Sequence, residues 1–378
     1  MEGLEKMKKL NIPTKIYSGT DSLTILDEIR DKKILLVCDS FLPGTEGLAH
    51  VLSHISDSNT VTIFSDVVPE PPLPTVMEGV KIYQTAAPSI IIAVGGGSAI
   101  DTAKGIRFFG EKVQDNRIES FIAIPTTSGT GSEVTQHAVM SDPARGEKAP
   151  ILNDHLIPDI AILDAQMVVS CPKSVTAYSG LDALTHAIEA LISRDATMFT
   201  DAFAEKAIDI ISHHLVTVYQ NPENLEERKL VHEASTCAGL AFSDAGLGIC
   251  HSLAHQIGAK FHVPHGLANA MLLPYIIEFN AQDKENAQKL GQAIIKADLG
   301  TSTLSNQLLI KRLQKHIFKM MKAMDCPKTL IEFGIKETEV YENMDWIISH
   351  AKKDGTFPGN RMVPTDEELR QLIAKIIK

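Results

Sequence analysis

The sequence has few cysteines, and their spacing excludes the small proteins that disulfides or zinc ribbons hold together. The five are Cys38, Cys171, Cys237, Cys250 and Cys326, an odd number that contains no CxxC pair. Disulfide frameworks need paired cysteines, and structural zinc sites need closely spaced ones. We therefore expect reduced, mostly buried thiols in a cytoplasmic protein.

Long apolar runs and clusters of basic residues are also missing. The longest apolar runs, such as residues 90–94, fall far short of the ~20 residues that a membrane-spanning helix needs. Acidic residues outnumber basic ones by 47 to 36, which gives a net charge of −11. The first stretch, MEGLEKMKKLNIPTK, mixes both charges without an apolar core, so it does not read as a secretory signal. We expect neither a membrane nor a nucleic acid as partner.

What the first half does contain is an alternation of strand and helix patterns. Strands are expected at 33–38, 61–64, 90–94 and 121–124, and helices at 22–30, 74–85 and 99–109. Short apolar runs of this kind are typical of strands buried on both faces. The alternation predicts an α/β domain with a doubly wound, mostly parallel sheet, which we place at residues 1–176. Residues 177–378 carry long helical patterns and predict an all-helical domain.

Two polar, glycine-rich stretches follow expected strands. The first is GGGSAIDTAKG, in which Gly95, Gly96 and Gly97 would let a phosphate approach the backbone and Ser98 could cap the next helix. The glycines do not complete the dinucleotide fingerprint, so a structural turn is an equally good interpretation. The second is PTTSGTGSEVT, residues 125–135. At the same sheet edge it favours phosphate or ribose binding over a plain loop.

Asp39 directly follows the first expected strand. An acidic residue there can accept hydrogen bonds from ribose hydroxyls and would repel a 2′-phosphate, which favours NAD over NADP. Aspartates at strand ends also commonly cap helices, so the position alone leaves both interpretations open.

Metal-binding residue types gather in the second half. Asp182 and His186 are four residues apart, so on a helix they would share one face. Four of the fourteen histidines lie in GLGICHSLAHQIGAKFHVPHGLANAMLLP: His251, His255, His262 and His265. Neutral imidazole is the commonest protein ligand for divalent metals. A surface pair and ordinary hydrogen-bonded histidines are the alternatives.

Four motifs together resemble the iron-containing (group III) alcohol dehydrogenases along essentially the whole chain. They are GGGSAIDTAKG, IPTTSGTGSEVT, SGLDALTHAIEA and GICHSLAHQIGAKFHVPHGLANA. The stretches KIYSG, AILDAQMVVS and AFSDAGLG look most like the family members that serve 1-propanol metabolism in bacterial microcompartments. The resemblance implies a dehydroquinate synthase-like two-domain architecture and a homodimer or larger homo-oligomer, with other microcompartment enzymes as possible partners.

The resemblance also assigns residues. It places the metal ligands on Asp182, His186, His251 and His265, and an additional active-site histidine on His255. It places the nucleotide contacts on Asp39, Gly95, Gly96, Gly97, Ser98, Asp101, Thr126, Thr127, Thr130 and Lys148. We add two hypotheses: His255 relays a proton, and His262 lines the substrate pocket or is simply a hydrogen-bonded loop residue.

The expected activity is NAD(H)-dependent interconversion of a short primary alcohol and its aldehyde, with 1-propanol and propionaldehyde as the specific expectation. Three imidazoles and one carboxylate suit Fe(II), with Zn(II) as the alternative. A related polyol dehydrogenase or dehydroquinate-synthase-like lyase is the other enzymatic interpretation. A metal- and nucleotide-binding assembly or sensor protein is the non-enzymatic one.

Overall fold

The computed structural model describes residues 7–114, 116–142 and 147–378, with the side chains of 147–149 outside the description. Contacts divide the chain into two compact units. The sheet unit comprises Ile12–Cys171 and Pro222–Thr236, and the helical unit comprises the N-terminal segment up to Asn11, Pro172–Asn221 and Cys237–Lys378. The first long segment of the sheet unit therefore ends at Cys171, and residues 222–236 also belong to that unit. The domain limit at 176/177 stays a prediction.

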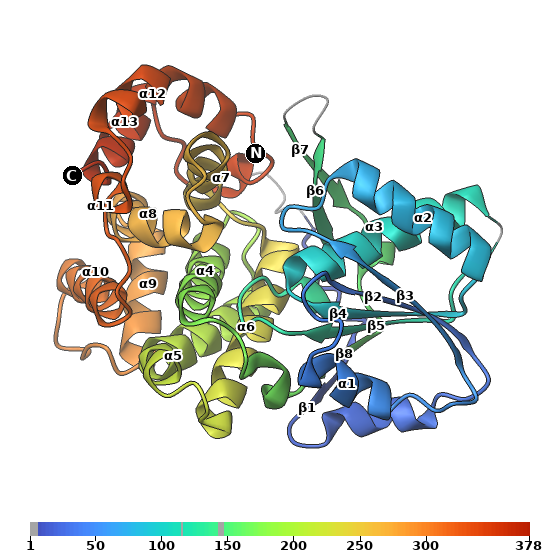
Figure 1. Cartoon of the computed structure of the whole chain (residues 1–378). Coiled ribbons are helices and arrows are strands. Elements are labelled where there is room, and N and C mark those ends of the chain that lie inside the picture. Colours follow the sequence, from blue (N-terminus) through green and yellow to red (C-terminus); the bar gives the residue numbers. More distant parts are fainter. Residues whose placement is uncertain (1–6, 115, 143–146) are drawn as a thin grey trace. The chain divides into compact units, whose positions relative to one another are not determined.

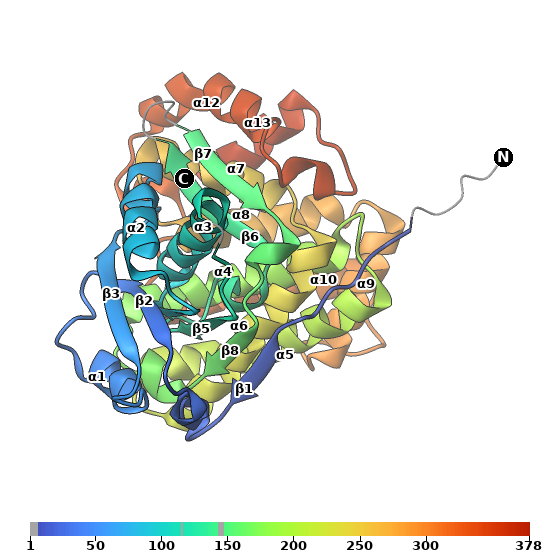
Figure 2. The same cartoon turned by 90° about the vertical axis from the view of Figure 1, so that its right-hand side faces the viewer.

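The sheet unit is built on six strands, each paired in parallel with its neighbours (Figure 1). Their order is β1-β8-β5-β4-β2-β3. The strands are β1 (Lys15–Ser18), β2 (Lys33–Asp39), β3 (Thr60–Val67), β4 (Ile90–Gly95), β5 (Ser120–Pro125) and β8 (Ile160–Leu163). An antiparallel hairpin of β6 (His137–Asp142) and β7 (Glu147–Leu152) packs through β6 on α3 (Gly97–Val113), as Figure 2 shows.

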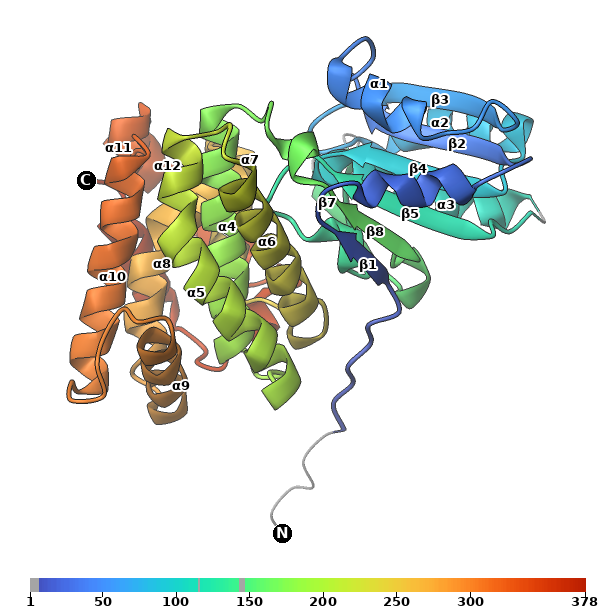
Figure 3. The same cartoon turned by 90° about the horizontal axis from the view of Figure 1, so that it is seen from below.

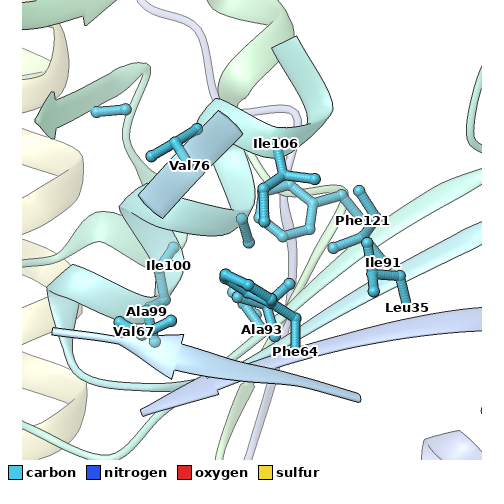
Figure 4. Close-up of a cluster of buried hydrophobic side chains, with 14 of the residues drawn as sticks. Leu35, Phe64, Val67, Val76, Ile91, Ala93, Ala99, Ile100, Ile106 and Phe121 are labelled. Atoms are coloured by element: carbon cyan, nitrogen blue, oxygen red, sulfur yellow. The ribbon is translucent and has the colours of Figure 1, made fainter. Parts of the chain in front are cut away.

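Alternate residues of the central strands β2, β4 and β5 enter two separate cores, one on each face of the sheet. Leu35, Ile91 and Phe121 face α3 and α2 (Leu73–Ala86), where they meet Ile100, Ile106 and Val76 (Figure 4). Ile34, Ile92 and Ile122 face α1 (Glu46–Ser53) and the 3-10 helix η1 (Ser22–Glu28). Such strands must be apolar on both faces, which explains the continuous apolar runs in the sequence. Short 3-10 helices complete the unit: η2 (Ser132–Val134), η3 (Asp154–Leu156) and η4 (Ala165–Val168).

The helical unit is organised around α4 (Lys173–Ile192), which packs against α5 and α8. From Gly180 to Ile192 every residue of α4 is buried, so this helix lies inside the unit (Figure 3). The other helices are α5 (Met198–Gln220), α7 (Ile249–Phe261), α8 (His265–Asn280), α9 (Lys284–Lys296), α10 (Asn306–Ala323), α11 (Leu330–Phe333), α12 (Glu337–Ala351), η5 (Phe357–Gly359) and α13 (Asp366–Lys375). Helix α6 (Leu225–Ala245) belongs to this unit only from Cys237 on. The predicted fold class, a parallel-sheet domain followed by a helical one, is confirmed.

Candidate metal centre and nucleotide-binding edge

The sheet has its topological switch point between β2 and β4. From β2 the chain goes outward to β3, and from β4 it goes to β5 on the other side. The register pairs Cys38 with Val94, so Asp39 and Gly95 end their strands at the same edge. In open parallel sheets, ligands bind in the crevice outside the carboxyl ends of the strands at this point.

Asp39 holds the glycine turn that follows β4. Its Oδ2 accepts a hydrogen bond from the backbone N–H of Gly96 at 2.9 Å. Gly95 has a φ of 152°, and a Cβ there would lie 2.4 Å from the same oxygen. Burial raises the pKa of Asp39, and the hydrogen bond from Gly96 opposes this shift. Only glycine fits at position 95 without displacing the carboxylate.

The start of α3 is bordered by threonines from the second polar loop. A Cβ on Gly97 would lie 2.6 Å from Cγ2 of Thr130, and one on Gly96 would lie 3.5 Å from Thr127. The N-cap of α3 is Gly96, which has no side chain to cap the helix. The expectation that Ser98 caps α3 is therefore wrong, because Ser98 already lies in the first turn. A helix N-terminus with no side-chain cap, approached by hydroxyls, fits an anionic phosphate.

Asp101 lies below this turn and bonds to the protein with both carboxylate oxygens. Oδ1 accepts a hydrogen bond from Ser132 Oγ at 2.6 Å, and Oδ2 accepts one from the N–H of Val139 at 2.9 Å. Thr126 is buried, and its N–H donates to the carbonyl of Gly95 at 3.0 Å. The predicted cofactor contacts of Asp101 and Thr126 stay predictions. In the structure, the hydrogen bonds of these two residues connect the two polar loops.

Sequence reasoning missed Lys104, which anchors the same loop. Its buried ammonium donates to Ser132 Oγ at 2.9 Å and to the carbonyls of Thr135 at 2.9 Å and His137 at 2.7 Å. Burial lowers the pKa of Lys104 to about 8, while the charges of Asp101 and Glu133 act in the opposite direction. Its position one helical turn after Asp101 was the available signal.

The N-terminal part of α6 also holds the loop, within the sheet unit. His232 Nδ1 lies 2.9 Å from Ser128 Oγ, and Thr236 Oγ1 donates to Glu133 at 2.7 Å. No sequence pattern connects His232 to a site. It is buried, and burial followed by the nearby Arg228 charge lowers its pKa to about 4. The ring is therefore neutral at physiological pH.

Lys148 lies in β7, where its backbone pairs with Ser141. Its side chain lies outside the described part of the chain, so its predicted nucleotide contact stays a prediction.

In the helical unit, three helices bring four predicted metal ligands together. Asp182 and His186 share one face of α4, His251 lies in the first turn of α7, and His265 begins α8. One ligand atom each of Asp182, His186 and His251 lies within 4.8 Å of the others, and all three residues are buried. Nε2 of His265 lies 3.4 Å from Oδ1 of Asp182. The rings of His186 and His251 stack 4.6 Å apart.

The turn between α7 and α8 explains how His265 reaches the group. His262 takes the left-handed conformation, φ 54°, as the C-cap of α7, and Pro264 is the N-cap of α8. One helix therefore ends and the next begins within three residues. His262 is itself exposed, and its pocket role stays a prediction.

The group is electrostatically suited to a cation. Burial would raise the pKa of Asp182, but the nearby rings of His186, His265 and His251 outweigh it and hold the pKa well below its usual range. Burial alone would lower the pKa of His251, but the carboxylates of Asp182 and Glu189 raise it to about 9. Buried negative charge at this point favours positive charge, whether on a ring or on a divalent ion.

Three further residues orient these side chains, and sequence reasoning missed all of them. Asn269, fully buried, donates to Oδ1 of Asp182 at 2.7 Å. Glu189 accepts from Nδ1 of His251 at 2.6 Å, and Asp354 lies 2.8 Å from Nδ1 of His255. Asp354 also accepts two hydrogen bonds from Thr356. Burial raises its pKa, but the bonded His255 ring outweighs this and holds it below the usual value.

The uncapped N-terminus of α3 at the sheet edge suits a nucleotide phosphate, and the buried carboxylate–imidazole group of the helical unit suits a divalent metal ion. Together these features are typical of enzymes that use a nucleotide and a metal ion. Two family models match the chain: "Iron-containing alcohol dehydrogenase" over residues 13–165 and "Fe-containing alcohol dehydrogenase family, C-terminal" over residues 176–377. The chain belongs to the iron-containing alcohol dehydrogenase family. It is therefore an enzyme, an alcohol dehydrogenase of the iron-containing type.

Known proteins are similar to this chain over nearly its full length. The 1-propanol dehydrogenase PduQ of Citrobacter freundii is 39% identical over 371 residues, which covers 98% of this chain and all of the relative. The NADPH-dependent butanol dehydrogenase of Clostridium saccharobutylicum is 36% identical, with 97% of each chain covered. A crystal structure of a 1,3-propanediol oxidoreductase superposes with a TM-score of 0.91 at 29% identity, covering 98% of this chain and 100% of that one. Among the described residues, no helix has the length and apolar character to cross a membrane.

Proposed function

We propose that this alcohol dehydrogenase interconverts 1-propanol and propionaldehyde, using NAD(H) and a divalent metal ion held by Asp182, His186, His251 and His265. The observation that carries the metal-dependent part is the buried group formed by Asp182, His186 and His251. The choice of substrate is supported by the 39% identity to a 1-propanol dehydrogenase along the whole chain.

The donor set fits the ion. Nε2 of His251 is buried and makes no hydrogen bond, although it lies 3.6 Å from Oδ1 of Asp182. An unsatisfied imidazole nitrogen beside a carboxylate is what a metal ligand requires. Three imidazoles and one carboxylate accept Fe(II), which the family implies, and would also accept Zn(II). The ion would act as a Lewis acid on the substrate oxygen.

The sheet unit would bind NAD(H). The N–H groups at the start of α3, bordered by Thr127 and Thr130, suit the pyrophosphate. Asp39 would accept from the ribose while its Oδ2 keeps the hydrogen bond from Gly96. A carboxylate there disfavours a 2′-phosphate, so we propose NAD(H) over NADP(H).

His255 would move the proton that accompanies hydride transfer. Asp354 accepts from its Nδ1, which leaves Nε2 as the atom that can exchange a proton. The ring stacks on that of His265, with the ring centroids 5.1 Å apart, so His255 lies beside a proposed metal ligand.

For assembly and location, we propose a homodimer or larger homo-oligomer that works in the cytoplasm, in or beside a bacterial microcompartment. Strand β1 supports the proposed assembly, because it is an edge strand of the six-stranded sheet and all four of its residues are exposed. The likeness to PduQ supports the location.

The test uses purified protein stripped of metal and reloaded with Fe(II) or Zn(II). NADH and NADPH are then offered with aldehydes of increasing chain length, and NAD+ and NADP+ are offered with polyols. We expect metal-dependent oxidation of NADH that is fastest with propionaldehyde. Turnover of polyols alone would favour the polyol dehydrogenase alternative. No oxidation with any aldehyde, despite bound metal and NADH, would favour the binding or sensor alternative.

A further inference from the structure

Glu189 belongs to the metal group by position but not by any ligand role. It lies three residues after His186 on α4, and the i, i+4, i+7 spacing from Asp182 puts all three on one helix face. Its side chain is 1% exposed. Oε2 accepts from Nδ1 of His251 at 2.6 Å, and Oε1 accepts from the N–H of Cys250 at 2.7 Å.

The carboxylate also replaces the missing cap of α7. Gly248 is the N-cap and offers no side chain, and Cys250 is among the first residues whose N–H lacks a partner within the helix. A Cβ on residue 248 would lie 2.9 Å from Oε1 of Glu189. Glycine there makes room for a carboxylate that comes from another helix. Negative charge at a helix N-terminus is favourable.

This contact determines the tautomer of His251. A carboxylate only accepts hydrogen bonds, so Nδ1 must carry the proton. In the neutral ring that binds a metal ion, Nε2 then presents its lone pair, and it is the nitrogen that lies 3.6 Å from Asp182. Carboxylates that accept from a ligating histidine fix its orientation and make it a stronger donor.

We propose that Glu189 is a positioning residue of the metal centre, which holds His251 in the Nδ1–H tautomer with Nε2 directed at a divalent transition-metal ion. This rests on the metal site under Proposed function. It goes further by making metal affinity depend on a residue that does not touch the ion.

Glu189→Gln separates this role from plain helix capping. If the amide oxygen keeps the bond from Cys250, the amide N–H₂ faces Nδ1 of His251 and demands the other tautomer, whose Nε2–H cannot bind metal. If the amide turns round, its N–H₂ opposes the N–H of Cys250 and the start of α7 is displaced. Either outcome weakens metal binding, whereas a residue needed only for helix capping would tolerate the first orientation.

The experiment titrates Co(II) into the metal-free full-length protein, with a competing chelator and the visible Co(II) absorption as readouts. We expect Glu189→Gln to bind Co(II) about 10- to 100-fold more weakly than wild type and with an altered spectrum. Glu189→Asp keeps the charge but not the reach, and we expect it to lose affinity as well. Asp182→Ala, which removes a ligand, is the reference for a lost site.

The outcomes are distinguishable. Wild-type protein that binds no Co(II) would refute the metal site itself. Folded Glu189→Gln with wild-type affinity and spectrum would overturn the role of Glu189 and leave the metal site intact. Should the variant fail to fold, nitrogen NMR of histidine-labelled, Zn(II)-loaded wild type decides. It should show His251 protonated on Nδ1, and a proton on Nε2 would refute the proposal.

Discussion

At the scale of single residues, the proposed metal centre depends on pairs of side chains that orient one another across separate helices. Asp182 and His186 follow a helical spacing that can be read directly. The partners of the other site residues are remote: Glu189 and His251 are 62 positions apart, and Asp354 and His255 are 99 apart. No local periodicity connects such pairs, because only packing of separate helices brings them together.

His255 and Asp354 form a pair whose contribution can be measured. His255→Ala should lower kcat by about 10²- to 10⁴-fold, because a positioned proton carrier contributes about that much. Asp354→Asn should lower kcat less, since the ring remains but its Nδ1–H loses a charged acceptor. KM for NADH should change little in both, because neither residue lies in the sheet unit. A wild-type kcat in His255→Ala would contradict the relay.

Asp39→Asn tests the cofactor preference. The amide oxygen can keep the bond from Gly96, while the charge that repels a 2′-phosphate is gone. The ratio of kcat/KM for NADPH to that for NADH should rise by about tenfold or more, which corresponds to ~1.4 kcal/mol. Steady-state kinetics with both cofactors measure it. Asp159→Asn is the control, because that carboxylate accepts a hydrogen bond from the N–H of Phe121 near the start of β5 and is not among the predicted nucleotide contacts. An unchanged ratio would mean that Asp39 serves only the glycine turn.

At the scale of elements, long buried strands and long helices are predictable and short exposed ones are not. β2, β4 and β5 are buried on both faces and lie close to their expected positions. β1 and β8 have four residues each, too few for a pattern, and β1 is exposed throughout. The hairpin of β6 and β7 mixes polar and apolar residues. The division of α6 is a tertiary effect, because its first half packs with the sheet unit through His232 and Thr236.

The buried His232 of α6, which contacts Ser128 of the second polar loop, predicts that the stability of the protein depends on pH. Folding lowers the pKa of His232 from 6.5 to about 4, so between these values the unfolded chain binds a proton that the folded chain does not. Stability therefore falls as pH drops from about 6.5 towards 4, by ~2 kcal/mol at pH 5. His232→Asn cannot titrate, and its urea midpoint should fall less than that of wild type between pH 7 and 5.

Ser128→Ala is the matched control for this prediction. It removes the loop contact but keeps the buried ring, so its stability should retain the wild-type dependence on pH. Equal slopes for wild type and His232→Asn would show that another group causes the acid sensitivity.

At the scale of the whole molecule, each unit carries one half of the proposed chemistry, and the sequence predicted both halves from motifs at strand ends and on helix faces. Composition and motifs do not show which surface of the chain would form an oligomer. The relevant feature is the sheet edge at β1, where Ile16 and Tyr17 are 38% and 37% exposed. Edge strands usually carry charges or prolines that prevent pairing. β1 carries one charge, Lys15, next to the two large side chains of Ile16 and Tyr17.

A second copy can pair with that edge. Two β1 strands related by a two-fold axis would run antiparallel and join both sheets, a self-complementary contact that closes at the dimer. Ile16→Lys/Tyr17→Lys should shift the mass measured by light scattering from dimer to monomer. The free energy of unfolding of each chain should change by only about 0.5 kcal/mol, because the side chains of Ile16 and Tyr17 lie outside the core. Met198→Lys/Phe199→Lys makes an equal change at residues that are 77% and 57% exposed in the helical unit, and it should leave the dimer intact. A dimer that survives the β1 change and dissociates with the α5 change would place the interface on the helical unit instead.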